Sequence, residues 1–167
     1  GSKEAVGRIR KFPMKRALRM SKLPLAALEA TLSLYLRPER LAKDLPTLRL
    51  LTRPTDAIRE MAAALQGPVE AAVSPRFTVA VVPLLGQIGS GSLPVERLPS
   101  AGLALAPAGT SKKGLGTALD KLASAWRGLP LPVIGRIAED RLLLDLRCLE
   151  DSTAFVAQLP LLKELLS

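Results

Sequence analysis

The chain has 167 residues, 48% of them hydrophobic, which is enough for one compact core with a helical extension. Its 24 Lys and Arg outnumber 15 Asp and Glu, and the net charge of +9 favours a polyanionic partner such as RNA or a phosphorylated small molecule. The alternative is a basic, solvated surface without such a partner, and the charge alone favours this alternative. Histidine is absent and Cys148 is the only cysteine, which excludes zinc sites, disulfides and Ser-His or Cys-His nucleophile pairs within the chain. We therefore expect no metal site.

No uninterrupted apolar run is long enough to span a bilayer or to act as a secretory signal. We expect no membrane partner and a cytoplasmic location. Residues 1–2, Gly-Ser, resemble the remnant of a cleaved expression tag, and a charged helical segment follows at once without an initiator methionine. These features predict that the chain was excised from a longer one.

Residues 3–52 are predicted to form a helical arm without strands. Its prolines suit helix starts better than helix interiors: Pro13, Pro24, Pro38 and Pro46. An apolar stripe recurs at helical spacing over Leu25, Leu28, Leu32 and Tyr35, and such a stripe is typical of packing on a neighbouring domain. Arg53-Pro54 marks the predicted boundary, so residues 53–167 are expected to form a C-terminal domain.

The C-terminal domain is predicted to alternate between helices and short strands. A helix from Thr55 should be interrupted at Gly67-Pro68, and a second helix is expected over 114–129. Strands are predicted at 77–83 and 101–107, followed by a hairpin within 132–149. The last helix should begin at Asp151 or Ser152 and kink or restart at Pro160. This order predicts an α+β fold, a small antiparallel sheet with helices on one face.

The hairpin is predicted to turn at Glu139-Asp140, a weaker turn signal than Asn-Gly. Pairing Ala138 with Arg141 sorts the side chains onto two faces. The core face would hold Val133, Gly135, Ile137, Leu142, Leu144 and Leu146. The other face would hold Ile134, Arg136, Leu143, Asp145 and Arg147, with Arg136 and Asp145 as diagonal neighbours on a solvated or interdomain surface.

Two motifs resemble cofactor sites without meeting their requirements. The segment 86–94, GQIGSGSLP, is glycine-rich but lacks the Lys-Ser/Thr ending of a phosphate loop. The segment 111–113, SKK, lies in a polar, glycine-rich stretch that offers no buried setting for a reactive lysine. We interpret both as loops and assign no catalytic residue within the chain.

The basic segment from Arg8 to Lys22 contains no acidic residue, and helical spacing after Pro13 would place Arg16 and Arg19 on one side. Two guanidiniums three residues apart can hold one phosphate-like anion with several charge-assisted hydrogen bonds. The alternative is a helix face that is solvated or lies against an acidic neighbour.

Four blocks carry a resemblance to a known family: KFPMKRALRMSKLPLAALEATLSLYLRPERL, LPTLRLLTRP, QIGSGSLPVERLPSAGLAL and LPVIGRIAEDRLLLDLRCLED. Taken in this order and spacing, they resemble the C-terminal part of the bacterial selenocysteine synthases, the L-seryl-tRNA(Sec) selenium transferases. The resemblance spans residues 4 to 158.

The resemblance implies the small domain of a fold type I pyridoxal-phosphate enzyme that works as a ring of dimers. The intact enzyme would convert seryl-tRNA(Sec) to selenocysteyl-tRNA(Sec) with selenophosphate as the selenium donor. The Schiff-base lysine would lie upstream, in a large domain that this chain lacks, so the chain alone is expected to be inactive and to bind no pyridoxal phosphate.

The same resemblance implies that Arg16 and Arg19 face the anionic selenium donor. Arg136 and Arg147 are further candidates, because fold type I enzymes often bind the substrate carboxylate with an arginine of the small domain. Two alternatives stay open. One is a nucleic-acid-binding or assembly module whose basic arm binds phosphates without chemistry, and the other is the small domain of another fold type I pyridoxal-phosphate enzyme.

Overall fold

The computed structural model describes residues 1–86, 97–109 and 114–167. The chain divides into two compact units, Gly1–Arg49 and Leu50–Ser167. We refer to them as the N-terminal unit and the C-terminal unit. The helix α5 (Pro46–Leu51) crosses the division, which precedes the boundary expected at residue 53.

The N-terminal unit is built of short helices, none of which buries a side chain fully: α1 (Lys3–Lys11), α2 (Lys15–Leu18), α3 (Lys22–Leu34) and α4 (Pro38–Asp44). Leu25, Leu28 and Leu32 stay 41–55% exposed, so the described residues of this unit do not cover the predicted apolar stripe.

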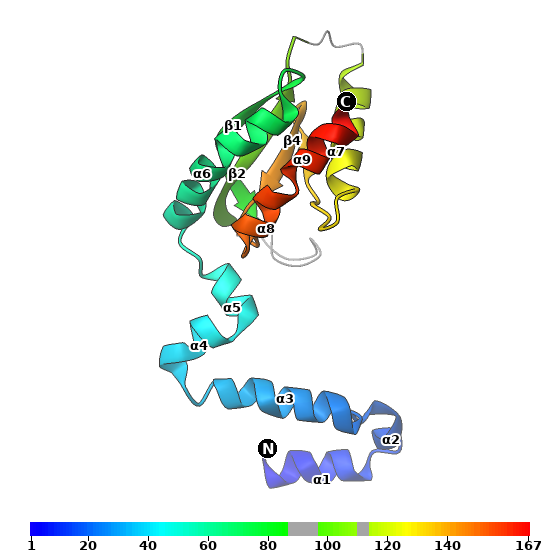
Figure 1. The fold of residues 1–167 in the computed structure, drawn as a ribbon. Coiled ribbons are helices and arrows are strands. Elements are labelled where there is room, and N and C mark those ends of the chain that lie inside the picture. The colour runs from blue at the N-terminus through cyan, green and yellow to red at the C-terminus, as the bar shows by residue number, and fades with distance from the viewer. Residues whose placement is uncertain (87–96, 110–113) are drawn as a thin grey trace. The chain divides into compact units, whose positions relative to one another are not determined.

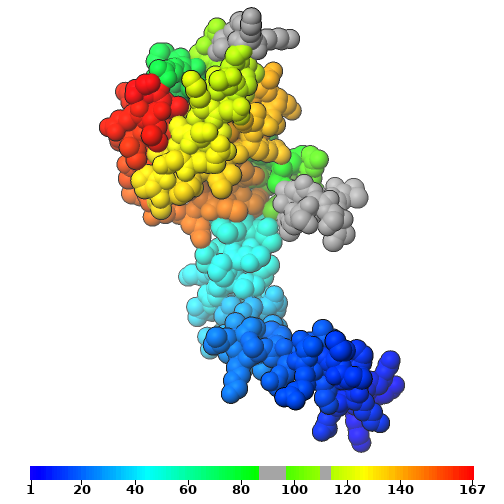
Figure 2. All heavy atoms as spheres, turned by 90° about the vertical axis from the view of Figure 1, so that its right-hand side faces the viewer, coloured from blue at the N-terminus to red at the C-terminus, as the bar shows by residue number. Residues whose placement is uncertain are grey.

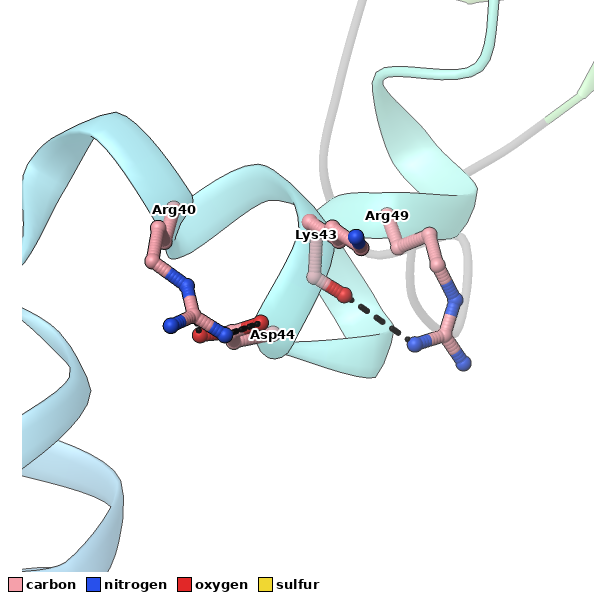
Figure 3. Close-up of polar contacts among 4 residues, drawn as sticks. All are labelled: Arg40, Lys43, Asp44 and Arg49. Atoms are coloured by element: carbon pink, nitrogen blue, oxygen red, sulfur yellow. Dashed lines mark hydrogen bonds and ion pairs between the residues drawn. The ribbon is translucent and has the colours of Figure 1, made fainter.

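Local polar contacts hold the end of the N-terminal unit together (Figure 3). Arg40 Nε lies 3.1 Å from Asp44 Oδ2, one helical turn further along α4. Arg49 Nη1 donates to the carbonyl of Lys43 at 3.1 Å. These contacts are exposed and each contributes little, as is usual for surface ion pairs.

The first helix of the C-terminal unit, α6 (Thr55–Val73), runs through Gly67 and Pro68, so the predicted interruption is wrong. Its buried side chains continue on both sides of the proline: Ile58, Ala62, Leu65, Val69, Ala72 and Val73. Pro68 itself is exposed, so water can satisfy the carbonyl one turn earlier that loses its N–H donor. Packing therefore outweighs the local cost of the proline. No described helix, α6 included, is long and apolar enough to cross a membrane.

The described strands form one antiparallel sheet in the order β1-β2-β4-β3. They are β1 (Phe77–Gly86), β2 (Leu98–Pro107), β3 (Arg136–Ala138) and β4 (Arg141–Asp145). The helices α6 and α7 (Leu115–Arg127) pack against the sheet, and α9 (Leu159–Leu166) packs on both helices (Figure 1). Figure 2 shows α9, in red, beside α7, in yellow. The predicted α+β class is confirmed.

The hairpin has the predicted register, with Ala138 opposite Arg141. Glu139 and Asp140 both take positive φ, 51° and 58°, which is the backbone of a type I′ turn. Leu142 and Leu144 are buried in the core, as predicted. Ile137 is 45% exposed instead, because β3 is a three-residue edge strand that the helices do not cover.

The main core lies between the helices and one face of the sheet. Trp126 of α7 stacks on Phe155 of α8 (Ser152–Ala157), with ring centroids 5.5 Å apart. The predicted start of α8 is confirmed, since Asp151 Oδ1 accepts from the amide of Ala154 at 2.8 Å. The restart at Pro160 is confirmed too, because α9 begins at Leu159 with the proline in its first turn.

Candidate functional site

The basic segment falls on α1, α2 and the residues that follow them. The side chain of Ser2 caps α1 by accepting from the amide of Ala5 at 3.2 Å. Arg16 lies in α2, but this helix ends at Leu18 and Arg19 has an extended backbone, φ −73° and ψ 141°. The helix therefore ends one residue before Arg19, and the two arginines do not lie together on one helix face as predicted. Both are exposed, and neither guanidinium has a hydrogen bond or ion pair with the described residues.

An open cleft of about 610 Å³ lies between α1 and α2. Its apolar lining comes from Ala5, Ile9, Phe12 and Leu18. Its cations are Arg8, Lys15 and Arg19, with no acidic residue in the lining. Arg16 does not line the cleft, so the structure brings Arg19 together with Arg8 and Lys15, which the sequence reasoning did not single out.

Arg136 lies on β3, at the face of the sheet opposite the helices. It lines a cleft with Arg97 and Asp145, as well as with apolar side chains from β1 and β4. Its guanidinium is exposed and has no partner among the described residues.

Arg147, by contrast, is 7% exposed, and both terminal nitrogens of its guanidinium are bonded, while its buried Nε has no partner among the described residues. Its Nη1 donates to the carbonyls of Leu50, Leu51 and Arg53, each at 3.1 Å, and its Nη2 donates to the carbonyl of Pro99. These contacts favour a structural role over the binding of a substrate carboxylate. The sequence pattern could not predict this structural role of Arg147, because all four acceptors are backbone atoms of residues distant in the sequence.

The glycine-rich segment 86–94 lies outside the described residues except for Gly86, and the segment 111–113 lies outside them entirely. Neither interpretation as a loop is therefore tested. In the described part of the chain, no group of three or more Cys, Asp and Glu is placed to hold a metal ion.

The described lysines do not fit a covalent pyridoxal-phosphate site. A lysine that holds this cofactor needs a desolvated pocket. Each of the described lysines is instead exposed: Lys3, Lys11, Lys15, Lys22, Lys43, Lys121 and Lys163. Lys121 lines a groove between α7 and the end of α9 beside Asp120 and Arg76, where it stays exposed to solvent.

Comparison with known proteins agrees with the sequence blocks. The family model described as "SelA: L-seryl-tRNA selenium transferase" matches residues 1–150. The L-seryl-tRNA(Sec) selenium transferase of Escherichia coli strain SMS-3-5 / SECEC is 56% identical over 159 residues, which are 95% of this chain and 34% of that protein.

The protein of the same name from Shigella boydii serotype 18, strain CDC 3083-94 / BS512, is 55% identical over 159 residues, again 95% of this chain and 34% of that protein. The chain thus spans about a third of the length of these curated relatives. Both the family model and the identity cover nearly all of the chain, so the chain belongs to the L-seryl-tRNA selenium transferase family.

Proposed function

We propose that this chain is the C-terminal part of an enzyme that converts seryl-tRNA(Sec) to selenocysteyl-tRNA(Sec). The observation that carries the proposal is the 56% identity to a selenium transferase over 95% of the chain. Pyridoxal phosphate, selenophosphate, the assembly into a ring of dimers and the cytoplasmic location belong to the same proposal. The cofactor would be held by the rest of the enzyme, since the described lysines do not fit it.

The exposed leucines of the N-terminal unit support a role as part of a longer protein. Leu25, Leu28 and Leu32 line a shallow apolar groove along α3. Burial of such a stripe against another surface is favourable by about 25 cal/mol per Å² of apolar area. The remaining two thirds of the relatives' length could supply that surface.

Within the enzyme, we assign Arg16 and Arg19 to the selenium donor. Selenophosphate is a small multivalent anion, and a guanidinium offers it permanently charged donors in a fixed fork. Both guanidiniums are available, because neither has a partner among the described residues. Arg8 and Lys15 in the same cleft as Arg19 add positive potential without a competing acid.

The test measures selenium transfer against selenophosphate concentration in the full-length enzyme, with tRNA(Sec) affinity measured in parallel. Alanine at position 16 or 19 should cost about 2 to 4 kcal/mol of transition-state stabilisation, and lysine should recover only part of the loss. Arg10→Ala is the matched control, since it removes one exposed cation from the same segment outside the cleft.

Three results would contradict the assignment. Transfer could stay at the wild-type level, the loss could follow wholly from weaker tRNA binding, or Arg10→Ala could be as defective as the two test positions. The last result would reduce the role of the segment to a general positive potential.

A further inference from the structure

The sheet face opposite the helices carries small side chains on its central strand, and the leucines of the neighbouring strands cover them. Ser100, Gly102 and Ala104 of β2 share this face with Leu84 of β1. A Cβ on Gly102 would lie 1.9 Å from the carbonyl oxygen of Leu144 and 2.8 Å from Leu84 Cδ1, so the position requires glycine. A cleft of about 360 Å³ opens on this face, a size that suits a small molecule.

The apolar wall of the cleft is fixed by close backbone packing. Leu84 and Leu143 are 8% and 7% exposed and form a small cluster that contains no helix residue. At Gly135 a Cβ would lie 2.8 Å from the carbonyl oxygen of Leu143, so only glycine allows the chain to approach β4 this closely. The residues on either side, Ile134 and Arg136, both line the cleft.

The polar groups of the cleft comprise two cations and one anion, Arg97, Arg136 and Asp145. Neither guanidinium has a partner among the described residues. The two oxygens of Asp145 differ. Its Oδ1 accepts from the hydroxyl of Ser100 at 2.6 Å and from the amide of Arg147 at 3.0 Å. Its Oδ2 holds no such bond within the described residues and lies toward Gly86, 3.7 Å from where a Cβ on that residue would be.

A ligand that satisfies this arrangement carries one anionic group, one cationic donor and a small apolar body. The two guanidiniums match a carboxylate, which accepts bidentate hydrogen bonds from arginine. The free oxygen of Asp145 matches an ammonium and would repel a multiply charged phosphate. The leucines of the wall match an aliphatic side chain.

We propose that this cleft binds a free α-amino acid with an aliphatic side chain. Arg97 and Arg136 hold its carboxylate, and Asp145 Oδ2 accepts from its ammonium. Leu84 and Leu143 contact the side chain. The site stands on the described cleft alone and does not depend on the proposed selenium transfer, so either proposal can fail without the other.

Titrations of the ¹⁵N-labelled 167-residue chain, followed by amide chemical shifts, test the site. The probes are L-leucine, L-leucine methyl ester without the carboxylate charge, 4-methylpentanoate without the ammonium, and inorganic phosphate. L-Leucine should give saturable shifts at Leu84, Gly135 and Leu143. Each of the other probes should have an affinity at least about tenfold lower than that of L-leucine.

Arg97→Gln and Arg136→Gln should each weaken leucine binding about tenfold or more. Arg141→Gln is the matched control, because Arg141 pairs with Glu139 at the hairpin turn and does not line the cleft. Asp145→Asn should bring the affinities of leucine and 4-methylpentanoate close together. The absence of saturable leucine shifts, equal affinity in the Arg136 and Arg141 variants, or tighter binding of phosphate than of leucine would each overturn the proposal.

Discussion

The side chains of Arg53 and Arg147 each donate a hydrogen bond to the backbone carbonyl of the other residue. Arg53 Nη1 donates to the carbonyl of Arg147 at 3.0 Å, and Arg147 Nη1 donates to the carbonyl of Arg53 at 3.1 Å. Arg53 also reaches the carbonyl of Leu149 at 2.6 Å. The two guanidiniums thus join the segment before α6 to the turn after β4 using peptide dipoles as acceptors, which spares the cost of burying a carboxylate.

Replacement of Arg147 by alanine should destabilise the C-terminal unit by about 2 to 4 kcal/mol, because four carbonyls in partly buried contacts lose their donor together. Lysine should restore less than half of the loss, since one ammonium cannot reach the same set of acceptors. Urea unfolding measures the free energy. Arg127→Ala is the control, because Arg127 is exposed and bonds only to the hydroxyl of Ser124 among the described residues. Equal losses in the two alanine variants would rule out the reciprocal contact as a source of stability.

Two glycines should respond to alanine in opposite directions. At Gly102 the added methyl meets the backbone of β4, so Gly102→Ala should destabilise the chain by about 3 kcal/mol or more. At Gly67, an exposed position in α6, a Cβ would have no neighbour among the described residues within 4 Å, so alanine should stabilise the chain by about 0.5 to 1 kcal/mol. Thermal and urea unfolding of the pair measure both signs. Destabilisation at Gly67 would mean that Pro68 distorts the helix there.

The hairpin shows which features of the fold can be predicted from the sequence. The alternation of leucines around Glu139-Asp140 was enough to predict the register, because a slip of one residue would move Leu142 and Leu144 out of the core. The same alternation placed Arg147 beside Arg136 on the open face, which is wrong because β4 ends at Asp145 and the chain turns. Where a strand ends depends on tertiary contacts, here those of Arg147 with the distant carbonyls, and no local pattern encodes them.

For the candidate sites too, the sequence predicts the residues that a local pattern marks, but not those that only the tertiary fold brings together. The basic segment and Arg136 could be found from charge and spacing, since both are local properties of the chain. Arg97 could not be linked to Arg136, because the two meet only through the strand order β1-β2-β4-β3. The exposed cations of the α1 and α2 cleft were part of the predicted segment, but the early end of α2 decides which of them meet.

RNA binding by this chain should be weak and should not distinguish tRNA(Sec) from tRNA(Ser). The exposed cations of α1 and α2 can attract phosphates, and such binding falls steeply with salt because counterions are released. Fluorescence anisotropy of both tRNAs at several salt concentrations measures the slope and the selectivity. Tight, selective binding to tRNA(Sec) near physiological salt would favour the nucleic-acid-binding module over the proposed enzyme part.

Pyridoxal phosphate should leave no specific lysine adduct on this chain. Because the described lysines are exposed, none should react better than surface lysines in general. The chain is incubated with one equivalent of the cofactor, reduced with borohydride and mapped by mass spectrometry, with an unrelated protein of similar lysine content as the control. Stoichiometric labelling of a single lysine would show that the chain carries a cofactor site of its own.

The stacked pair of Trp126 and Phe155 gives the molecule a built-in optical reporter. Trp126 is the only tryptophan, it is fully buried, and it belongs to the C-terminal unit, while the only tyrosine, Tyr35, is 53% exposed in the N-terminal unit. Excitation at the long-wavelength edge of the tryptophan absorption band excites Trp126 and not Tyr35. The emission therefore reports on the C-terminal unit alone. A melting curve recorded by that emission is silent about α1 to α4, whose loss of structure becomes visible only by circular dichroism or in the tyrosine signal.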